Sequence, residues 1–176
     1  MAPMKITLFL LLFLATFTYA KTKLGHHKEI EMTIYYHDYA GGPNATTIEI
    51  PRPSTGHLNY TRFGAMLCAD DPITEGIEKD SVPIARGQVI YIISALDGSY
   101  AQILMSVVFI NGKYKGSTIE IQGSYDQSLV TVPEAAVVGG TGKFRLAFGY
   151  ATFEIVSYDS VTGYSLTRSN MTILHY

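Results

Sequence analysis

The sequence predicts a single all-β domain, built either as a sandwich or as an up-and-down barrel. Polar and apolar residues alternate with a period of two along most of the chain, which is the periodicity of a half-buried strand. The alternating runs are rich in Tyr, Val, Ile, Thr and Phe, which suit a pleated sheet. Glycine-containing turn signals separate these runs, and no convincing amphipathic helix follows the first 20 residues.

Six runs are predicted as strands. Five of them alternate between polar and apolar residues, whereas 104–110 is almost entirely apolar and is predicted to be the most buried strand. The six runs are 31–36, 88–93, 104–110, 115–122, 150–156 and 164–168.

Five turn signals connect the runs, among them an Asn-Gly and an Asp-Gly pair, the strongest local markers of a hairpin. They are 41–44, 96–99, 111–112, 139–142 and 159–163. About eight strands joined in this way favour a barrel or a sandwich, and a barrel would remove exposed edges and leave a mouth for a ligand. The Gly-Gly-Thr-Gly turn at 139–142 is not a phosphate loop, because strand-like Lys143–Ala147 follows it instead of a helix.

The N-terminus predicts a secretory signal peptide over residues 1–20. Lys5 precedes the apolar stretch 6–20, and small residues stand before Lys21. A membrane anchor is the alternative, but it needs about 18–20 apolar residues and this stretch is shorter. Cleavage after Ala20 would leave a flexible tail at 21–28 and one domain at 29–176, with no membrane segment.

The composition argues against nucleic acid as a partner, because the formal net charge is −2 and no basic stripe is present. The single cysteine, Cys68, allows no internal disulfide, and its apolar neighbours favour a buried thiol over a reactive one. Three N-x-S/T sequons begin at Asn44, Asn59 and Asn170, and in a secreted chain they are candidate glycan sites.

Four segments together carry a family likeness. They are Tyr-Tyr-His-Asp at 35–38; Phe-Gly at 63–64 leading to Asp-Asp-Pro-Ile-Thr at 70–74; 115–123; and 137–151 with its Gly-Gly-Thr-Gly turn. In order and spacing they resemble the plant dirigent proteins over about 29–176. The resemblance implies an eight-stranded antiparallel up-and-down barrel, of the dirigent and allene-oxide-cyclase type, that forms a homo-oligomer, with a trimer favoured, in the apoplast.

The resemblance also implies a function. Dirigent proteins bind phenoxy radicals made by a separate laccase or peroxidase, such as those of a monolignol, and direct the stereochemistry of their coupling to lignans. Some relatives are instead lyases that close a ring through a quinone methide to give pterocarpans. A carbohydrate- or wall-binding module that uses surface aromatic residues is a third hypothesis. No cofactor is expected, and the five histidines lack the spacing of a metal site.

Aromatic side chains are the expected walls of a phenol-binding pocket. The chain has 13 Tyr and 8 Phe but no Trp. Tyr36 and Tyr91 lie on predicted strands, where alternate side chains point inward. The alternative for each is core or subunit packing.

Asp38 is the predicted catalytic acid, because it matches the pocket acid of the family at the end of the first strand. A carboxyl group desolvated in a barrel has a raised pKa and can protonate a quinone methide. The alternative role is a cap on the following turn. Asp70 and Asp71 are further pocket candidates, although an Asp before Pro72 often opens a turn. His37 should point to the face opposite Asp38.

Two positions depart from the lignan-forming relatives. Lys143 stands where they usually carry an acid, and Phe148 stands where they carry an Arg. The resemblance therefore places the chain outside the lignan-forming subgroup, with a more apolar pocket to which Phe148 would contribute.

Overall fold

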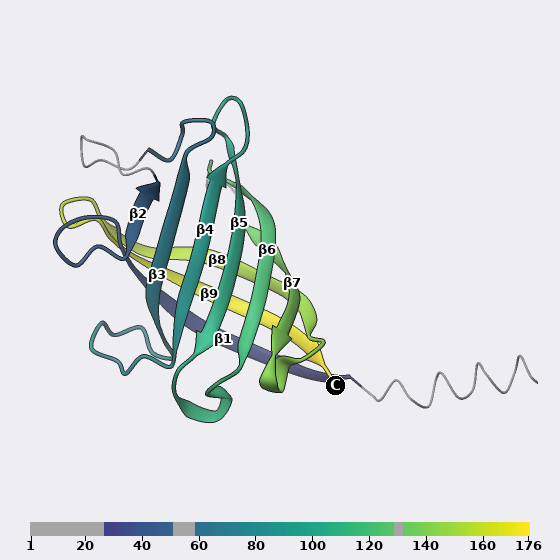
Figure 1. Cartoon of the computed structure of the whole chain (residues 1–176). Helices are drawn as coiled ribbons and strands as arrows, with labels where there is room; N and C mark the ends of the chain where they lie inside the picture. Colours follow the sequence, from purple (N-terminus) through teal and green to yellow (C-terminus); the bar gives the residue numbers. More distant parts are fainter. Residues whose placement is uncertain (1–26, 51–58, 129–131) are drawn as a thin grey trace, which may run out of the picture.

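The structure is a computed structural model that describes residues 27–50, 59–128 and 132–176. The predicted signal peptide and most of the predicted tail lie outside these residues. Eight long strands form a closed antiparallel ring in the order β1-β9-β8-β7-β6-β5-β4-β3, and β1 pairs with β3 to complete it (Figure 1). The short strand β2 pairs with β3 beside this closure. The predicted eight-stranded antiparallel barrel is confirmed.

The strands are β1 (Lys28–Tyr39), β2 (Thr47–Ile50), β3 (Met66–Thr74), β4 (Ala85–Ile93), β5 (Tyr100–Phe109), β6 (Thr118–Asp126), β7 (Glu134–Thr141), β8 (Phe148–Asp159) and β9 (Tyr164–His175). Four of the six predicted runs lie wholly in strands, whereas 104–110 and 115–122 extend beyond β5 and β6 by one and three residues. Each predicted turn contains a glycine with φ between 59° and 80°. No helix in the described part of the chain is long and apolar enough to cross a membrane.

Three strands, β2, β3 and β7, were not predicted, and two predicted segments are turns. Lys143–Ala147 contains the 3₁₀ turn η2 (Gly142–Phe144) instead of a strand, and residues 115–117 follow the 3₁₀ turn η1 (Gly112–Tyr114). The Asp-Asp-Pro sequence lies inside β3 instead of opening a turn. Its Pro72 is tolerated there because it stands between the stretches where β3 pairs with β1 and with β2.

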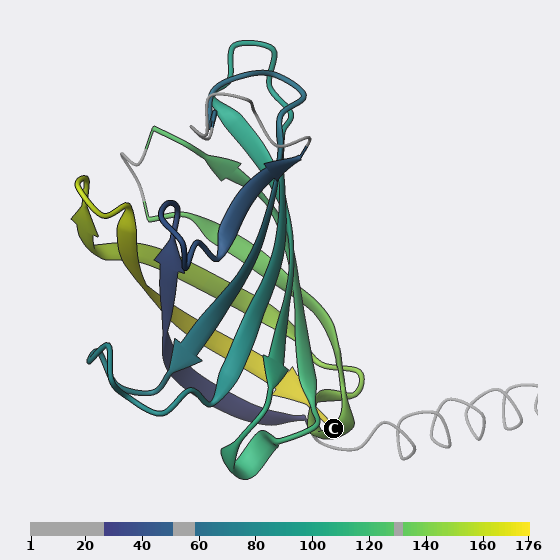
Figure 2. The same ribbon diagram turned by 60° about the vertical axis from the view of Figure 1, so that its left-hand side comes forward.

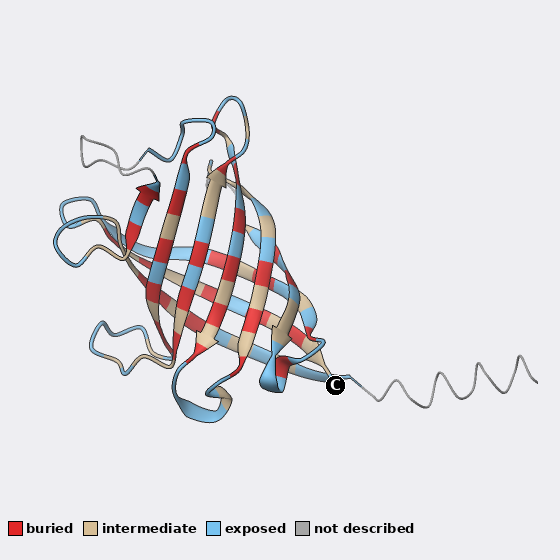
Figure 3. Ribbon diagram, in the orientation of Figure 1, coloured by how far each residue is buried: buried red, intermediate tan, exposed pale blue. Residues whose placement is uncertain are grey.

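Burial alternates along much of the barrel, most regularly in β5, so that one side chain in two points into the barrel there (Figure 3). The prediction that 104–110 is the most buried strand was wrong, because Leu104 on the outer face of β5 is 46% exposed. Cys68 is partly exposed on the outer face of β3, instead of buried as predicted.

One end of the barrel is filled by aromatic rings. Phe144 is fully buried and stacks on Phe109 with the ring centroids 5.6 Å apart, while Tyr114 lies 4.9 Å from Phe144. These rings come from β5 and from η1 and η2, which close this end. We call it the packed end. In Figure 2 the η1 and η2 turns lie at the same end as the C-terminus.

His37 points outward from β1 and is buried in a hydrogen-bonded cluster. The Thr74 hydroxyl donates to the carbonyl of Gly76 at 2.5 Å, so it accepts from Nε2 of His37 at 2.8 Å. Nδ1 then accepts from the Tyr164 hydroxyl at 2.9 Å. Burial, followed by the charge of Lys79, lowers the pKa of His37, so the imidazole is held neutral.

This cluster predicts a pH dependence of stability. The unfolded chain binds a proton at His37 near pH 6.5, whereas the folded chain does so only at lower pH. The stability that His37 contributes is therefore present above about pH 6.5 and is lost as the pH falls toward the folded pKa. His37→Leu should cost roughly 1–3 kcal/mol at pH 7.5, because it removes the hydrogen-bond partner of the Thr74 and Tyr164 hydroxyls. Melting temperatures of both proteins should converge at pH 5.5, and a gap that widens there would refute the assignment.

Candidate functional site

A cavity of about 680 Å³ opens at the end of the barrel opposite the packed end. It is lined by residues of β1, β2, β4, β5, β6, β8 and β9 and of the adjoining loops. Its volume is within the range of sites that enclose a small organic ligand. We call this opening the mouth.

Small side chains on β5 and β9 leave part of this space open. Ala101, Ser165 and Thr167 line the mouth beside larger aromatic side chains, whereas isoleucine and phenylalanine fill the packed end. The register shift in β8 between Ile155 and Ser157 lies at the same rim, as bulges often do beside binding sites.

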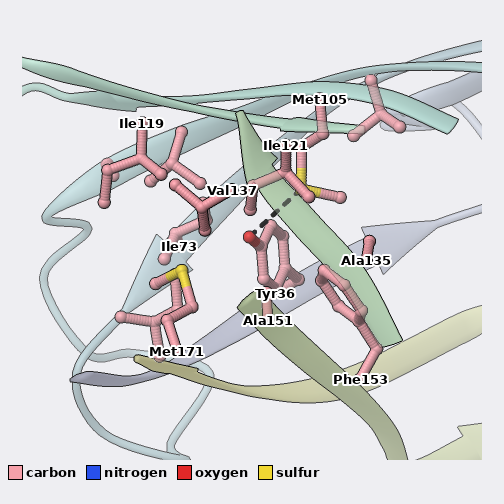
Figure 4. Close-up of a cluster of buried hydrophobic side chains, with 14 of the residues drawn as sticks. Tyr36, Ile73, Met105, Ile119, Ile121, Ala135, Val137, Ala151, Phe153 and Met171 are labelled. Carbon is pink, nitrogen blue, oxygen red and sulfur yellow. Dashed lines mark hydrogen bonds between the residues drawn. The ribbon is translucent and has the colours of Figure 1, made fainter. Parts of the chain in front are cut away.

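Met105 and Phe153 line the cavity, and the Tyr36 ring lies beside both of them in the core (Figure 4). The Tyr36 hydroxyl donates to Sδ of Met105 at 3.2 Å. A Cβ atom on Gly87 would lie 2.8 Å from the Tyr36 ring, so a glycine is needed to admit that ring. Tyr36, predicted to line the pocket, is not among the residues that line the cavity and packs against Met105 and Phe153 instead.

Asp38 lines the cavity from the end of β1. Its Oδ1 accepts a hydrogen bond of 2.7 Å from the Thr47 hydroxyl. Burial raises the pKa of Asp38, and hydrogen bonds from Thr47 and Thr46 oppose that shift. The strand alternation sends His37 to the other face, as expected from the sequence.

Phenol groups surround Asp38. Tyr91, which was predicted as a pocket residue, lines the cavity together with Tyr60, Tyr125 and Tyr158. Burial raises the pKa of Tyr91 well above its usual range, and the Asp38 carboxyl adds to the shift. The Tyr91 hydroxyl therefore stays neutral and can hydrogen-bond a ligand oxygen.

Tyr60 belongs to the loop 59–65, which a buried carboxylate holds in place. Glu49 is 2% exposed and points inward from β2. It accepts from the backbone N–H of Asn59 at 3.0 Å and is paired with Arg62. These two contacts fix both sides of Tyr60 in the loop.

The other predicted candidates lie apart from the cavity lining. Asp71 is buried and points inward from β3, but it is not among the residues that line the cavity. Asp70 points outward and pairs with Arg86 at 2.9 Å. The prediction for Phe148 was wrong: Ala151 and Phe153 point inward in β8, so Phe148 points outward and is 43% exposed. Its ring lies 5.1 Å from His27.

Several lining residues were not predicted. Thr47 lies in β2, a strand of four residues that gives no clear alternation. Tyr60 lies in a loop segment whose sequence indicates a glycan sequon and gives no signal for a pocket residue. Tyr125 extends β6 beyond the predicted run, and Phe153 could have been found from the alternation of β8.

The site can supply a proton to an oxygen atom of a phenolic ligand. A carboxyl group with a raised pKa faces an apolar space with neutral phenols around it. Among the described residues there is no group of three or more His, Cys, Asp or Glu side chains placed to hold a metal ion.

Comparisons with known proteins agree with this architecture. Residues 29–174 match the family model of dirigent-like proteins. A pterocarpan synthase 1 from Glycyrrhiza echinata is 33% identical over 174 residues, covering 96% of this chain and 93% of that protein. Dirigent protein 1 from Arabidopsis thaliana is 36% identical over 144 residues, covering 79% and 78%.

A solved structure of a pterocarpan synthase dirigent protein superposes with a TM-score of 0.76 at 31% identity, covering 86% of this chain and 87% of that one. The family match spans nearly all of the described barrel. This chain belongs to the dirigent protein family.

Proposed function

We propose that the protein binds a phenolic compound in its cavity and directs bond formation at a quinone methide, with Asp38 as the acid. The observation that carries the proposal is the position of Asp38. Its carboxyl group is desolvated, is held by Thr47, and faces a phenol-lined cavity. A quinone methide becomes more electrophilic when its carbonyl oxygen is protonated, so a positioned acid accelerates the addition of a hydroxyl.

The ring-closing version needs no oxidant. Asp38 donates a proton to the benzylic hydroxyl of an isoflavanol-like phenol, the C–O bond breaks and water leaves. The protonated quinone methide that remains is attacked by a second hydroxyl of the same molecule, and a new C–O bond forms. The proton of the attacking hydroxyl returns to Asp38, so the net change is loss of water. The similarity to pterocarpan synthases along nearly the whole chain supports this version.

The coupling version starts from two monolignol-like phenoxy radicals, made by a separate laccase or peroxidase. The cavity presents one face of each ring, so that coupling is stereoselective, as in lignan biosynthesis. Orientation is the main requirement, because the protein needs no nucleophile. Asp38 would then protonate the coupled quinone methide. The similarity to other dirigent proteins supports this version.

Two assays read by chiral chromatography separate these versions. An isoflavanol without oxidant should be dehydrated to a cyclic ether if the protein closes rings. Coniferyl alcohol with an added oxidase should give an excess of one enantiomer if it directs coupling. Racemic product in the second assay together with no product in the first would refute the proposal. If the protein then bound wall polysaccharide saturably, that binding would indicate a carbohydrate-binding module.

We also propose that the mature protein is secreted to the apoplast and glycosylated. Asn44, Asn59 and Asn170 are all exposed, and the Asn59 side chain accepts from the Thr61 hydroxyl of its sequon at 3.3 Å. The mature protein should begin at Lys21 and lose mass on treatment with a glycosidase. N-terminal sequencing and mass spectrometry of secreted material test both points.

The outer face of the barrel supports a homo-oligomer, and we propose a trimer. Ile48, Ile50, Ile90 and Leu104 project outward from β2, β4 and β5 and are 40–46% exposed. Ile90 and Leu104 line a shallow groove of about 480 Å³. Exposed apolar side chains gathered on one face are typical of subunit contacts. The particle mass measured by light scattering should be three times the protomer mass. Leu104→Glu places a charge in the contact and should reduce the particle mass to that of one protomer.

A further inference from the structure

A second buried carboxyl group lies behind the cavity and has no role in the mechanism above. Asp71 is 6% exposed and points into the barrel from β3. Burial of a carboxylate is costly unless it is paired or hydrogen-bonded. The Arg86 side chain nearby is bonded to Asp70 on the outer face. The interior partner of Asp71 is a hydroxyl group, that of Thr46.

The strands β1 and β3 separate where Asp38 and Asp71 stand. Their last antiparallel pair is Tyr36 with Ile73. The same register continued by two residues would set Asp38 opposite Asp71. Instead the two strands part, and residues 46–50 pair with β3 in place of β1. Both carboxyl groups therefore face the gap that Thr46 enters.

The Thr46 hydroxyl connects the two carboxyl groups. It accepts from the backbone N–H of Tyr39 at 3.0 Å and donates to Oδ1 of Asp71 at 2.5 Å. It also lies close enough to Asp38 to lower the pKa of that carboxyl group. A hydroxyl has one hydrogen and two lone pairs, so it cannot donate to both carboxylates at once. Thr46 can therefore serve both carboxyl groups only when one of them carries a proton.

We propose that Asp71 is a positioning residue that shares one proton with Asp38 through Thr46 and so keeps a proton available for Asp38 to donate. The proposal rests on the proposed function, in which Asp38 donates a proton to the substrate. After that donation both carboxyl groups are ionised and lie close together. Their repulsion favours return of the proton released by the attacking hydroxyl, so charge balances over one cycle.

The electrostatics of Asp71 agree with a shared proton. Burial, followed by the charge of Asp38, raises the pKa of Asp71 to about 7, although the hydrogen bond from Thr46 lowers it. Pairs of carboxyl groups that interact in this way titrate as a unit. The other titratable groups that face Asp71 are Tyr36 in β1, Tyr60 in the loop, Tyr91 and Arg86 in β4, and Asp70 beside it.

The pH profile of kcat tests the proposal. Activity that needs protonated Asp38 falls as the pH rises. Asp71→Asn removes the second carboxyl group of the pair, so Asp38 must hold the proton alone and this descending limb should move about one pH unit lower. The variant should show roughly tenfold lower kcat at pH 7, the wild-type kcat at pH 4.5 and the wild-type KM. Asp70→Asn removes the same charge one residue away on the outer face, and it should keep the wild-type profile.

A double-mutant cycle tests the link through Thr46. Thr46→Val keeps the size of the side chain but removes the hydroxyl, whereas Thr46→Ser keeps the hydroxyl and should preserve the profile. If the two carboxyl groups act through Thr46, Thr46→Val combined with Asp71→Asn should shift the limb no further than either single change. Additive shifts would overturn the proposal, as would a loss of kcat in Asp71→Asn that is equal at every pH.

Titration of the carboxyl groups in the absence of substrate tests the shared proton independently of the proposed function. Carbon-13 NMR of the aspartate carboxyl groups should show two coupled titration steps in the wild type and a single step for Asp38 in Asp71→Asn. Independent titration in the wild type would refute the shared proton. If Asp38→Asn retained activity, the proposed function would fail instead. If Asp38→Asn were inactive and Asp71→Asn kept the wild-type profile, only the inference would fail.

Discussion

Asp38→Asn should lose at least about 10²-fold in ring closure or in stereoselective yield while keeping the fold, because the worth of a positioned acid is typically of that size. The amide has nearly the shape of the carboxyl group, and its oxygen can still accept from the Thr47 hydroxyl. It cannot deliver a proton. The measurement is product yield and enantiomeric excess on a purified variant.

Stability separates this result from a purely structural role. Burial raises the pKa of Asp38, so the folded carboxyl destabilises the protein as the pH rises above its unfolded value near 3.9. The amide carries no such penalty, and the melting temperature of Asp38→Asn at pH 7 should equal or exceed that of the wild type. A cap that only holds the turn would instead cost about 1 kcal/mol and leave selectivity intact.

Asp70→Asn is the matched control, because it makes the same chemical change on the outer face. Asp70 pairs with Arg86, and its side chain is 54% exposed. It should retain yield and product handedness. Unchanged yield and handedness in a folded Asp38→Asn would remove Asp38 from the site and leave binding by the aromatic walls alone.

Strand alternation was enough to predict the all-β class and the relative direction of several side chains. It placed Asp38 and His37 on opposite faces, because neighbouring residues of a strand point to opposite faces, and the resemblance to a family put Asp38 inside. The turns were predictable because each needs a glycine with positive φ. The resemblance to a family was required to prefer a barrel over a sandwich, since both architectures share the same local pattern.

The candidate site was only partly predictable, because it depends on where strands separate. The Asp71-Pro72 sequence is locally typical of a turn. It lies within β3 because β1 and β3 are not paired at these residues. Thr46 gives no local signal, since its importance comes from lying between two residues distant in sequence. Phe148 was assigned to the pocket by comparison with relatives, although the alternation of β8 points it outward.

The division of the barrel into a packed end and a hollow end separates stability from function. The rings that fill the packed end come from β5 and from the η1 and η2 turns, and they are distinct from the residues that line the cavity. Side chains in a close-packed interior contribute to stability through their volume. Substitutions at the packed end should therefore change the melting temperature and leave the chemistry of the cavity unchanged.

Phe144→Ala should destabilise the protein by about 3–5 kcal/mol, the usual cost of deleting a buried aromatic ring. Phe144 is fully buried and contacts the rings of Phe109 and Tyr114, which cannot close the space it leaves. For a domain of this size the melting temperature should fall by roughly 6–20 °C. Leu146 is two residues away and 68% exposed, so Leu146→Ala should change stability by less than about 0.5 kcal/mol.

At a temperature where Phe144→Ala is folded, its kcat should equal that of the wild type. A tenfold loss of kcat in the folded variant would show that the packed end shapes the cavity, and that stability and function are not separated along the barrel axis.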